Sequence, residues 1–258
     1  MARKIANALY FSEKGRRSNN EDCIFPFPGE PVIPENLFIV CDGVGGAEKG
    51  EVASHLACES MAKWFAHNAP KSVNEALVLE AFAFTRQQFD AYLNDHPEAQ
   101  SMGTTLVLVH FNEDGCTVAH CGDSRLYHIR GNRILWKTMD HTPVNEMLRR
   151  GTITPEEARN SPRTSIISRA IQGRPHSVSH PETTILSDIQ PEDCFLLCSD
   201  GVWECFSNND LVSLLSASGS DEDKIQTIKT LCEADSRDNY SAWFIRIGGS
   251  HDHSIYEH

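Results

Sequence analysis

The chain has 258 residues, 40% of them apolar, and a formal net charge of −13 at pH 7 from 23 basic and 36 acidic side chains. This length and apolar content favour one large domain with a sizeable core. The acidic excess argues against a nucleic-acid or anionic-membrane partner, because phosphate-bearing surfaces are bound chiefly by lysine and arginine.

The nine cysteines are odd in number and contain no C-x-x-C pair, and several lie inside apolar strand patterns. This usage is typical of small core residues in a reducing compartment, not of disulfides or a zinc site. The segment that follows Met1–Lys4 is too polar for a signal peptide, and no window approaches the about 18 apolar residues of a membrane span. We therefore expect a cytoplasmic protein.

The first predicted element is a strand over residues 4–12, which alternate loosely between apolar and polar side chains. The polar loop that follows, residues 15–22, holds two arginines and two carboxylates, Glu21 and Asp22. A guanidinium matches a phosphate or a carboxylate in shape and charge, so an arginine here could hold an anionic ligand near a metal. The same composition also fits a solvated loop with a local ion pair.

Five apolar residues, Leu37–Cys41, predict a strand that is buried on both faces and stopped by Asp42 and the glycines after it. A later strand, residues 194–199, leads in the same way to Asp200 and a glycine. A carboxylate beside a glycine suits a hard divalent cation, because the missing side chain lets a backbone carbonyl approach closely. Taken singly, however, an Asp-Gly pair is more often a simple turn.

Two amphipathic helices are expected next, over residues 47–66 and 74–94. The glycines before the first helix do not form a nucleotide-binding loop. Gly45 and Gly50 have the spacing of a phosphate-binding loop, but Glu51 stands where that loop needs its lysine, and no G-x-G-x-x-G occurs there. Both kinds of nucleotide site are therefore excluded.

Residues 106–121 and 126–136 each predict a hairpin, and we interpret the whole block as one antiparallel meander. Residues 140–180 are polar, with two short helices, and we expect them to form an insertion, or flap, over one edge of the sheets. The remaining predicted elements are strands over 182–188, 194–199 and 240–247 and helices over 208–217 and 222–234.

We expect residues 1–247 to form a single domain. The end of the chain, residues 248–258, contains His251 and His253. These histidines could bind a metal, but a disordered tail is the better interpretation of a polar terminus.

Six short motifs, in this order, resemble those of the type 2C metal-dependent protein Ser/Thr phosphatases. They are Arg17…Asn20-Glu21-Asp22, Asp42-Gly43-x-Gly-Gly, Met102-Gly103-Thr104-Thr105, Gly122-Asp123-Ser124-Arg125, Ser199-Asp200-Gly201 and Asp238-Asn239. Together they extend over nearly the whole chain, and the two glycines after the first Asp-Gly match the bacterial members. The resemblance implies an α+β fold, a four-layer αββα sandwich of two antiparallel sheets packed face to face with helices outside each.

The resemblance also implies an activity, the hydrolysis of phosphoserine and phosphothreonine in proteins by a hydroxide that bridges two Mn²⁺ or Mg²⁺ ions. By matching position, Asp42 would bridge both ions and Gly43 would offer a carbonyl, while Asp200 and Asp238 would complete the second ion. Glu21 and Asp22 would hold metal-bound waters, and Asp123 would help to hold a third, weaker ion. Arg17 would hold the phosphate. The implied protein is a monomer that acts on phosphoproteins, opposing a Ser/Thr kinase.

One position departs from the family pattern. Eukaryotic relatives carry a histidine after the Asp-Gly that is taken to protonate the leaving alkoxide, and this chain has Val44, so the general acid is unassigned. Two other functions stay open: a pseudophosphatase or sensor that keeps the fold as a binding module, and a metallophosphohydrolase of small molecules. The retained Asp42, Asp200 and Asp238 argue against the binding module, which has no use for carboxylates that repel one another.

Overall fold

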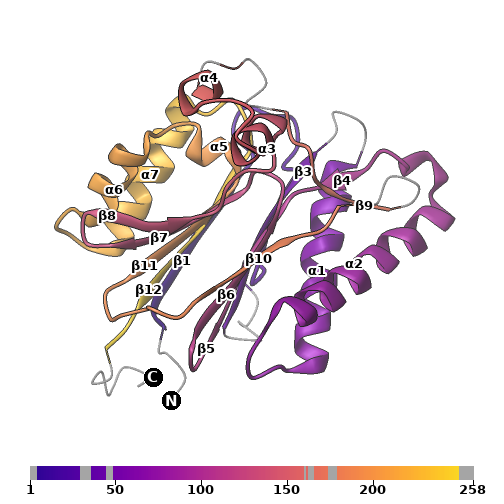
Figure 1. Cartoon of the computed structure of the whole chain (residues 1–258), viewed down its shortest axis with the longest axis horizontal. Coiled ribbons are helices and arrows are strands. Elements are labelled where there is room, and N and C mark those ends of the chain that lie inside the picture. The colour runs from indigo at the N-terminus through magenta and orange to yellow at the C-terminus, as the bar shows by residue number, and fades with distance from the viewer. Residues whose placement is uncertain are drawn as a thin grey trace.

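The computed structural model describes residues 5–29, 36–44, 49–159, 161, 166–173 and 179–249. Two antiparallel sheets pack face to face between two layers of helices (Figure 1). The four-layer αββα sandwich implied by the resemblance is therefore confirmed. Most of the tail that we predict to be disordered, from residue 250 onward, lies outside the described residues.

The twelve described strands divide into a five-stranded and a seven-stranded sheet. The first sheet contains β1 (Ile5–Glu13), β7 (Arg125–Arg130), β8 (Arg133–Lys137), β11 (Cys194–Cys198) and β12 (Tyr240–Ile247), in the order β1-β12-β11-β7-β8. The second contains β2 (Asp22–Phe25), β3 (Leu37–Val44), β4 (Gly103–Thr104), β5 (Leu106–Asn112), β6 (Gly115–Cys121), β9 (Ile171–Gln172) and β10 (Glu182–Leu186), in the order β10-β6-β5-β3-β4-β9 with β2 beside β3.

One group of helices covers each sheet on its outer face (Figure 1). The helices α1 (Gly50–Asn68) and α2 (Glu75–Asp95) pack on the seven-stranded sheet, and α5 (Asp200–Trp203), α6 (Asn208–Ser216) and α7 (Asp221–Asp235) pack on the other. The remaining helices are α3 (Pro143–Arg149), α4 (Pro155–Arg159) and a short 3-10 turn, Pro97–Ala99. None of the described helices is both long enough and apolar enough to cross a membrane.

The alternation of side chains along β3 explains how this fold builds its site. Ile39 and Cys41 pack against the helices, whereas Phe38 and Val40 pack in the core between the two sheets. Because successive side chains of a strand point to opposite faces, Asp42 continues the face of Phe38 and Val40. The apolar run thus carries a carboxylate to one end of the space between the sheets.

The prediction of one meander over residues 106–136 is wrong. β5 and β6 pair in the seven-stranded sheet, whereas β7 and β8 belong to the five-stranded sheet. The chain crosses between the sheets at Gly122, whose φ of 109° favours glycine and where a Cβ atom would lie 2.7 Å from the Thr105 side chain. A hairpin pattern predicts local pairing, but it does not say which sheet each hairpin joins.

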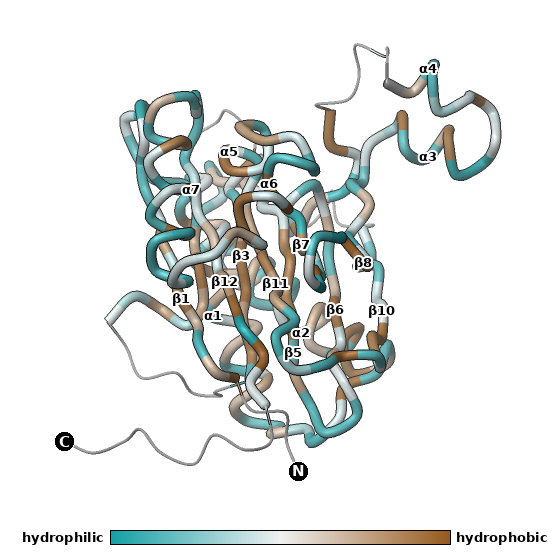
Figure 2. Tube along the Cα trace, turned by 90° about the vertical axis from the view of Figure 1, so that its left-hand side faces the viewer, coloured by the Kyte–Doolittle hydropathy of each residue, from teal (hydrophilic) through white to brown (hydrophobic). Residues whose placement is uncertain are grey.

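Four short elements are missing from the prediction: β2, β4, β9 and α5. β2 lies beside β3, and Asp22, the last residue of the predicted polar loop, is directly opposite Asp42. In the predicted flap, α3 and α4 stand clear of the sheets (Figure 2), and β9 returns to pair with β4. These elements are too short to show a hydrophobic period, so only tertiary contacts define them.

Candidate metal centre

Carboxylates from separate parts of the chain meet at one end of the sandwich. Asp42 on β3 lies opposite Asp22 on β2, and the electrostatic influence of Asp123, Asp200 and Asp238 also reaches Asp42. Burial raises the pKa of Asp42 well above its usual range, and these four negative neighbours raise it further. The structure therefore brings together the five aspartates that the motifs single out.

Backbone hydrogen bonds from β4 and the residue after it fix the position of Asp42. The Thr105 N–H donates to the Asp42 carbonyl at 2.8 Å, the Asp42 N–H donates to Thr105 Oγ1 at 3.0 Å, and the Thr104 hydroxyl donates to the same carbonyl at 2.8 Å. Thr105 Oγ1 also shares a hydrogen bond of 2.6 Å with the hydroxyl of Ser124. The Met-Gly-Thr-Thr motif thus connects Asp42 to the turn that carries Asp123, a role that sequence reasoning missed.

Two serines orient Asp22 without neutralising it. The Ser199 hydroxyl donates to Asp22 Oδ2 at 2.7 Å, and the Ser241 N–H donates to Ser199 Oγ at 3.0 Å. The other oxygen of Asp22, and Oδ1 of Asp200, are buried and accept no hydrogen bond in the described part of the chain. Buried carboxylate oxygens without a donor are free to accept a cation.

Asn239 holds the loop that contains Glu21. Its Oδ1 accepts the Glu21 N–H at 2.9 Å, and its Nδ2 donates to the carbonyls of Lys14 and Asn19 at 2.7 and 2.8 Å. A Cβ atom at Gly201 would collide with the Asn239 carbonyl, so the glycine after Asp200 permits this close approach. The Asp-Asn motif therefore supplies one carboxylate and one organising amide.

Glu21 and Gly43 lie where β2, β3 and the start of α1 meet. The Gly43 N–H donates to the Glu21 carbonyl at 3.0 Å, and a Cβ atom at Gly43 would collide with the backbone of Gly50. A Cβ atom at Gly50 would lie 2.6 Å from the Glu21 carboxylate. Burial raises the pKa of Glu21, and Glu51 adds to this shift. Gly45 and Gly46, which complete the motif, lie outside the described residues.

Arg17 lies at the solvent-exposed side of the carboxylate cluster. Its Nη2 atom forms an ion pair of 2.6 Å with Asp238 Oδ2, and 58% of its side chain is exposed. The other oxygen of Asp238 accepts the Asn239 N–H at 2.8 Å. A permanent cation therefore lies at the edge of the carboxylate cluster, where an anionic ligand could reach it.

The chemistry of this donor set fits hard divalent cations. Burial, and then the charges of neighbouring carboxylates, raise the pKa of Asp22 to about 7 and that of Asp200 to about 6, although hydrogen bonds to each group act in the opposite direction. The pKa of Asp123 is raised to about 7 by burial and by the charges of Asp200 and Asp140. Mn²⁺ and Mg²⁺ take oxygen ligands and would offset this repulsion.

A second group, His120, His141 and Glu182, has ligand-type atoms within 4.8 Å of one another. The Gly122 N–H donates to His141 Nδ1 at 3.1 Å, so the ring proton is on Nε2, which lies 3.5 Å from a Glu182 oxygen. The Arg169 guanidinium is 3.4 Å from the same Nε2. A protonated nitrogen beside a guanidinium cannot ligate a cation, and we interpret this group as a hydrogen-bonded support for the Gly122 turn.

Comparison with known proteins gives a consistent result. The model of the family Protein phosphatase 2C matches residues 32–234. The chain is 32% identical over 218 residues to the serine/threonine protein phosphatase PstP of Mycobacterium tuberculosis, covering 83% of this chain and 40% of PstP. It is 30% identical over 216 residues to the protein phosphatase PhpP of Streptococcus pneumoniae, covering 83% and 85%.

The solved structures include a similar protein with metal bound. The catalytic domain of PstP in complex with two manganese ions has a TM-score of 0.76 and 27% identity, and the match covers 94% of this chain and 98% of that one. Because this chain spans only 40% of the full mycobacterial protein, the similarity concerns the part that contains this fold.

The repulsion among the carboxylates predicts that Asp200→Asn raises the melting temperature in chelator, because it keeps the shape and removes one buried charge. With excess Mn²⁺ the wild type should instead melt higher than the variant. A ligand that binds only the folded state stabilises it by about 2.7 kcal/mol at a hundredfold excess over its Kd, and the wild type should gain more of this stabilisation than the variant. Thermal melts of both proteins with chelator and with Mn²⁺ test this. If the variant melts no higher without metal, Asp200 does not belong to a repelling cluster.

The raised pKa values predict that the metal-free protein loses stability as the pH rises through about 7. Asp22 and Asp123 have pKa values of about 7 in the folded protein, against about 3.9 in the unfolded chain. Between these two values the folded state binds more protons than the unfolded state. Stability therefore falls with rising pH until these carboxyl groups have lost their protons, at and just above about pH 7. His110 and His141, with pKa lowered to about 4 by burial, have the opposite effect, but chiefly below about pH 6.5, where unfolded histidine titrates.

The measurement is the melting temperature in chelator between about pH 6.5 and 8, where the carboxylates dominate. It should fall with pH for the wild type and fall less for Asp123→Asn. With excess Mn²⁺ the fall should disappear, because the bound ions keep the carboxylates deprotonated at all these pH values. A metal-free melting temperature that rises across this range would contradict the arrangement.

Proposed function

The chain belongs to the protein phosphatase 2C family, and from this we propose that it is a metal-dependent phosphatase that hydrolyses phosphoserine and phosphothreonine in proteins. The observation that carries the proposal is the meeting of Asp22, Asp42 and Asp200 in one cluster, with buried carboxylate oxygens that lack a donor among the described residues. A cluster of this kind costs stability unless cations occupy it, so it favours a catalytic function over a binding module.

The proposed ligands follow the family motifs position by position. Asp42 would bridge two Mn²⁺ or Mg²⁺ ions, which agrees with its central place among the aspartates. Asp200 and Asp238 would complete the second ion. The remaining proposed contacts are the Gly43 carbonyl, Glu21 and Asp22 to waters, and Asp123 to a third, weaker ion.

Bound divalent ions would supply a water of lowered pKa and would neutralise charge that develops on the phosphoryl oxygens. The contributions of the chain itself are orientation and binding. Ser199 and Thr105 keep Asp22 and Asp42 in place through hydrogen bonds of 2.7 and 3.0 Å. Arg17, which is exposed beside Asp238, would hold the phosphate dianion at the exposed side of the carboxylate cluster.

The setting of the enzyme is part of the proposal. All nine cysteines are free thiols, which supports a reducing compartment such as the cytoplasm. One chain carries the whole carboxylate cluster, so a monomer would suffice. We propose a single domain over residues 1–247, with a flap at 140–180, that acts on phosphoproteins modified by a Ser/Thr kinase. The relatives PstP and PhpP are named protein phosphatases, which supports this substrate class.

Turnover of a phosphothreonine peptide by metal-depleted protein, with and without added Mn²⁺, tests the function directly. Asp42→Ala should reduce the Mn²⁺-dependent rate to less than about a tenth of wild type, because water cannot replace one carboxylate that touches both ions. Asp114→Ala serves as the control, because this acidic residue lies in the β5–β6 turn, at the end of these two strands opposite to the motif residues. Residual activity of Asp42→Ala above that level would refute the bridging assignment.

Arg17→Ala should mainly raise KM, because Arg17 would already contact the phosphate in the ground state. The expected loss is roughly 1–3 kcal/mol of charge-assisted hydrogen bonding. Steady-state kinetics with the same peptide separate KM from kcat, and Arg17→Lys should recover only part of the loss, since it keeps the charge but not the planar fork. A pure kcat defect with unchanged KM would show that Arg17 has another role.

A further inference from the structure

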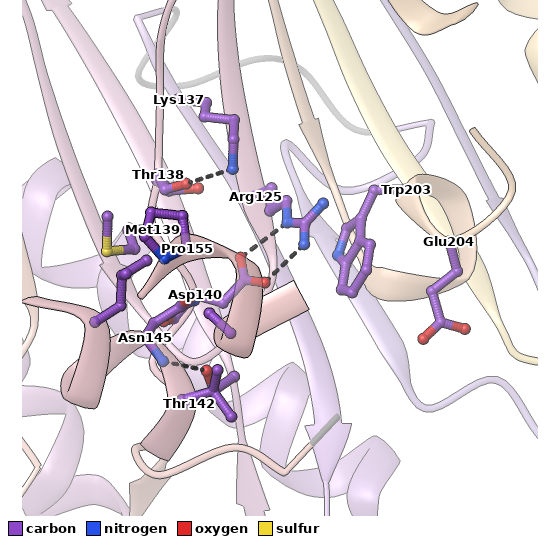
Figure 3. Close-up of a pocket in the computed structure, with 13 residues that line it drawn as sticks. Arg125, Lys137, Thr138, Met139, Asp140, Thr142, Asn145, Pro155, Trp203 and Glu204 are labelled. Atoms are coloured by element: carbon purple, nitrogen blue, oxygen red, sulfur yellow. Dashed lines mark hydrogen bonds and ion pairs between the residues drawn. The ribbon is translucent and has the colours of Figure 1, made fainter. Parts of the chain in front are cut away.

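An open cavity of about 600 Å³ lies between the flap helices and α5 (Figure 3). Its flap wall is mainly apolar, with Val144 and Leu148 on α3 and Pro155 and Ala158 on α4, and includes the polar Asn145 on α3. The indole of Trp203 forms the opposite wall. Cavities of roughly 300–1,000 Å³ with mainly apolar walls are the usual size and character of ligand sites.

The charges at the base of the cavity cancel. Arg125 donates through Nε and Nη2 to the two oxygens of Asp140, at 2.8 and 2.7 Å, and its guanidinium carbon lies 3.4 Å from the centroid of the Trp203 ring (Figure 3). This bidentate pair leaves neither charge available to a ligand, and the ring covers one face of the cation.

Two further charges flank the cavity, Lys137 and Glu204 (Figure 3). Neither forms an ion pair within 4 Å in the described part of the structure. A charged side chain entering the cavity would be attracted by one of these groups and repelled by the other, so together they select neither sign of charge. The mainly apolar walls favour a large apolar occupant.

Trp203 connects the cavity to the carboxylate cluster. The Trp203 Nε1–H donates to the carbonyl of Asp123 at 3.0 Å, and Trp203 belongs to the same helical turn as Asp200. Arg125 at the base of the cavity follows Asp123 by two residues. An extended peptide advances about 3.3 Å per residue, so a phosphorylated residue at the carboxylates would place its near neighbours in the chain over the cavity.

We propose that this cavity is the subsite for a large apolar side chain two or three residues from the phosphorylated residue of the protein substrate. The proposal rests on the proposed phosphatase function and names the sequence preference of that same site. The occupant is the substrate because the cavity is lined by Trp203 and Arg125, which belong to the same turns as Asp200 and Asp123 of the carboxylate cluster.

The test compares phosphothreonine peptides that carry leucine, alanine, lysine or glutamate at each of the three positions on either side of the phosphothreonine. At one position, two or three residues away, kcat/KM for leucine should exceed that for alanine by about tenfold, the usual value of a buried apolar group. Lysine and glutamate should not exceed alanine. p-Nitrophenyl phosphate, which is too short to reach the cavity, reports the activity of the metal centre alone.

Two pairs of matched variants test whether this cavity causes the preference for leucine. Ala158→Phe fills the cavity, and its leucine-to-alanine ratio should fall to about one, whereas Glu156→Phe on the exposed side of the same helix should keep the wild-type ratio. Leu148→Ala removes part of the apolar wall without filling it and should lower the ratio at least about threefold, whereas the neighbouring exposed Met147→Ala should not. Circular dichroism confirms that each variant folds.

A wild-type ratio near one at every position would overturn the proposal, as would equal effects of Ala158→Phe and Glu156→Phe. Binding of labelled peptides with a non-hydrolysable phosphonate, measured by fluorescence polarisation in Mn²⁺, decides the case without turnover. If no substrate is hydrolysed but leucine still improves the Kd and Ala158→Phe abolishes that gain, the phosphatase function fails and the subsite stands. If peptides are hydrolysed and leucine changes neither kcat/KM nor Kd, the subsite fails and the function stands.

Discussion

The repulsion among aspartates at one end of the sandwich is the constraint on which the rest of this structure depends. Asp22 and Asp42 face each other across paired strands, and the charges of Asp123, Asp200 and Asp238 reach Asp42 from three other parts of the chain. Burial raises the cost of each charge, and proximity raises it further. A chain folded for stability alone would not gather these groups, so the arrangement is explained by ions that offset it.

The groups around the carboxylates hold them in place without neutralising them. Hydroxyls of Ser199 and Thr105 and the amide of Asn239 bond to the carboxylates or to the backbone that carries them. Such neutral partners fix the direction of a carboxylate while most of its negative charge remains available to a cation. Glycines allow the same crowding of backbones: a side chain at Gly43 would collide with Gly50, and one at Gly201 would collide with the Asn239 carbonyl.

Much of the fold could be predicted because its long elements have clear periods. The strand predicted over residues 240–247 coincides with β12, and the helix predicted over 74–94 differs from α2 by one residue at each end. The motifs also identified the aspartates that the fold brings together. The sheet to which each hairpin belongs depends on the turn at Gly122, and the partners of Ser199 lie 177 and 42 residues away. The local sequence pattern predicts neither the sheet that a hairpin joins nor hydrogen-bond partners so distant in the chain.

The turn from Gly122 to Arg125 connects the aspartates to the flap. The His141 N–H donates to the Gly122 carbonyl at 2.9 Å, the Gly122 N–H donates to His141 Nδ1 at 3.1 Å, and Asp140 holds Arg125 by two hydrogen bonds. Asp140 and His141 precede Thr142, the N-cap of α3. A shift of α3 must therefore either carry this turn with it or break these bonds. Because Asp123 lies within the turn, these hydrogen bonds connect the start of the flap to one of the carboxylates.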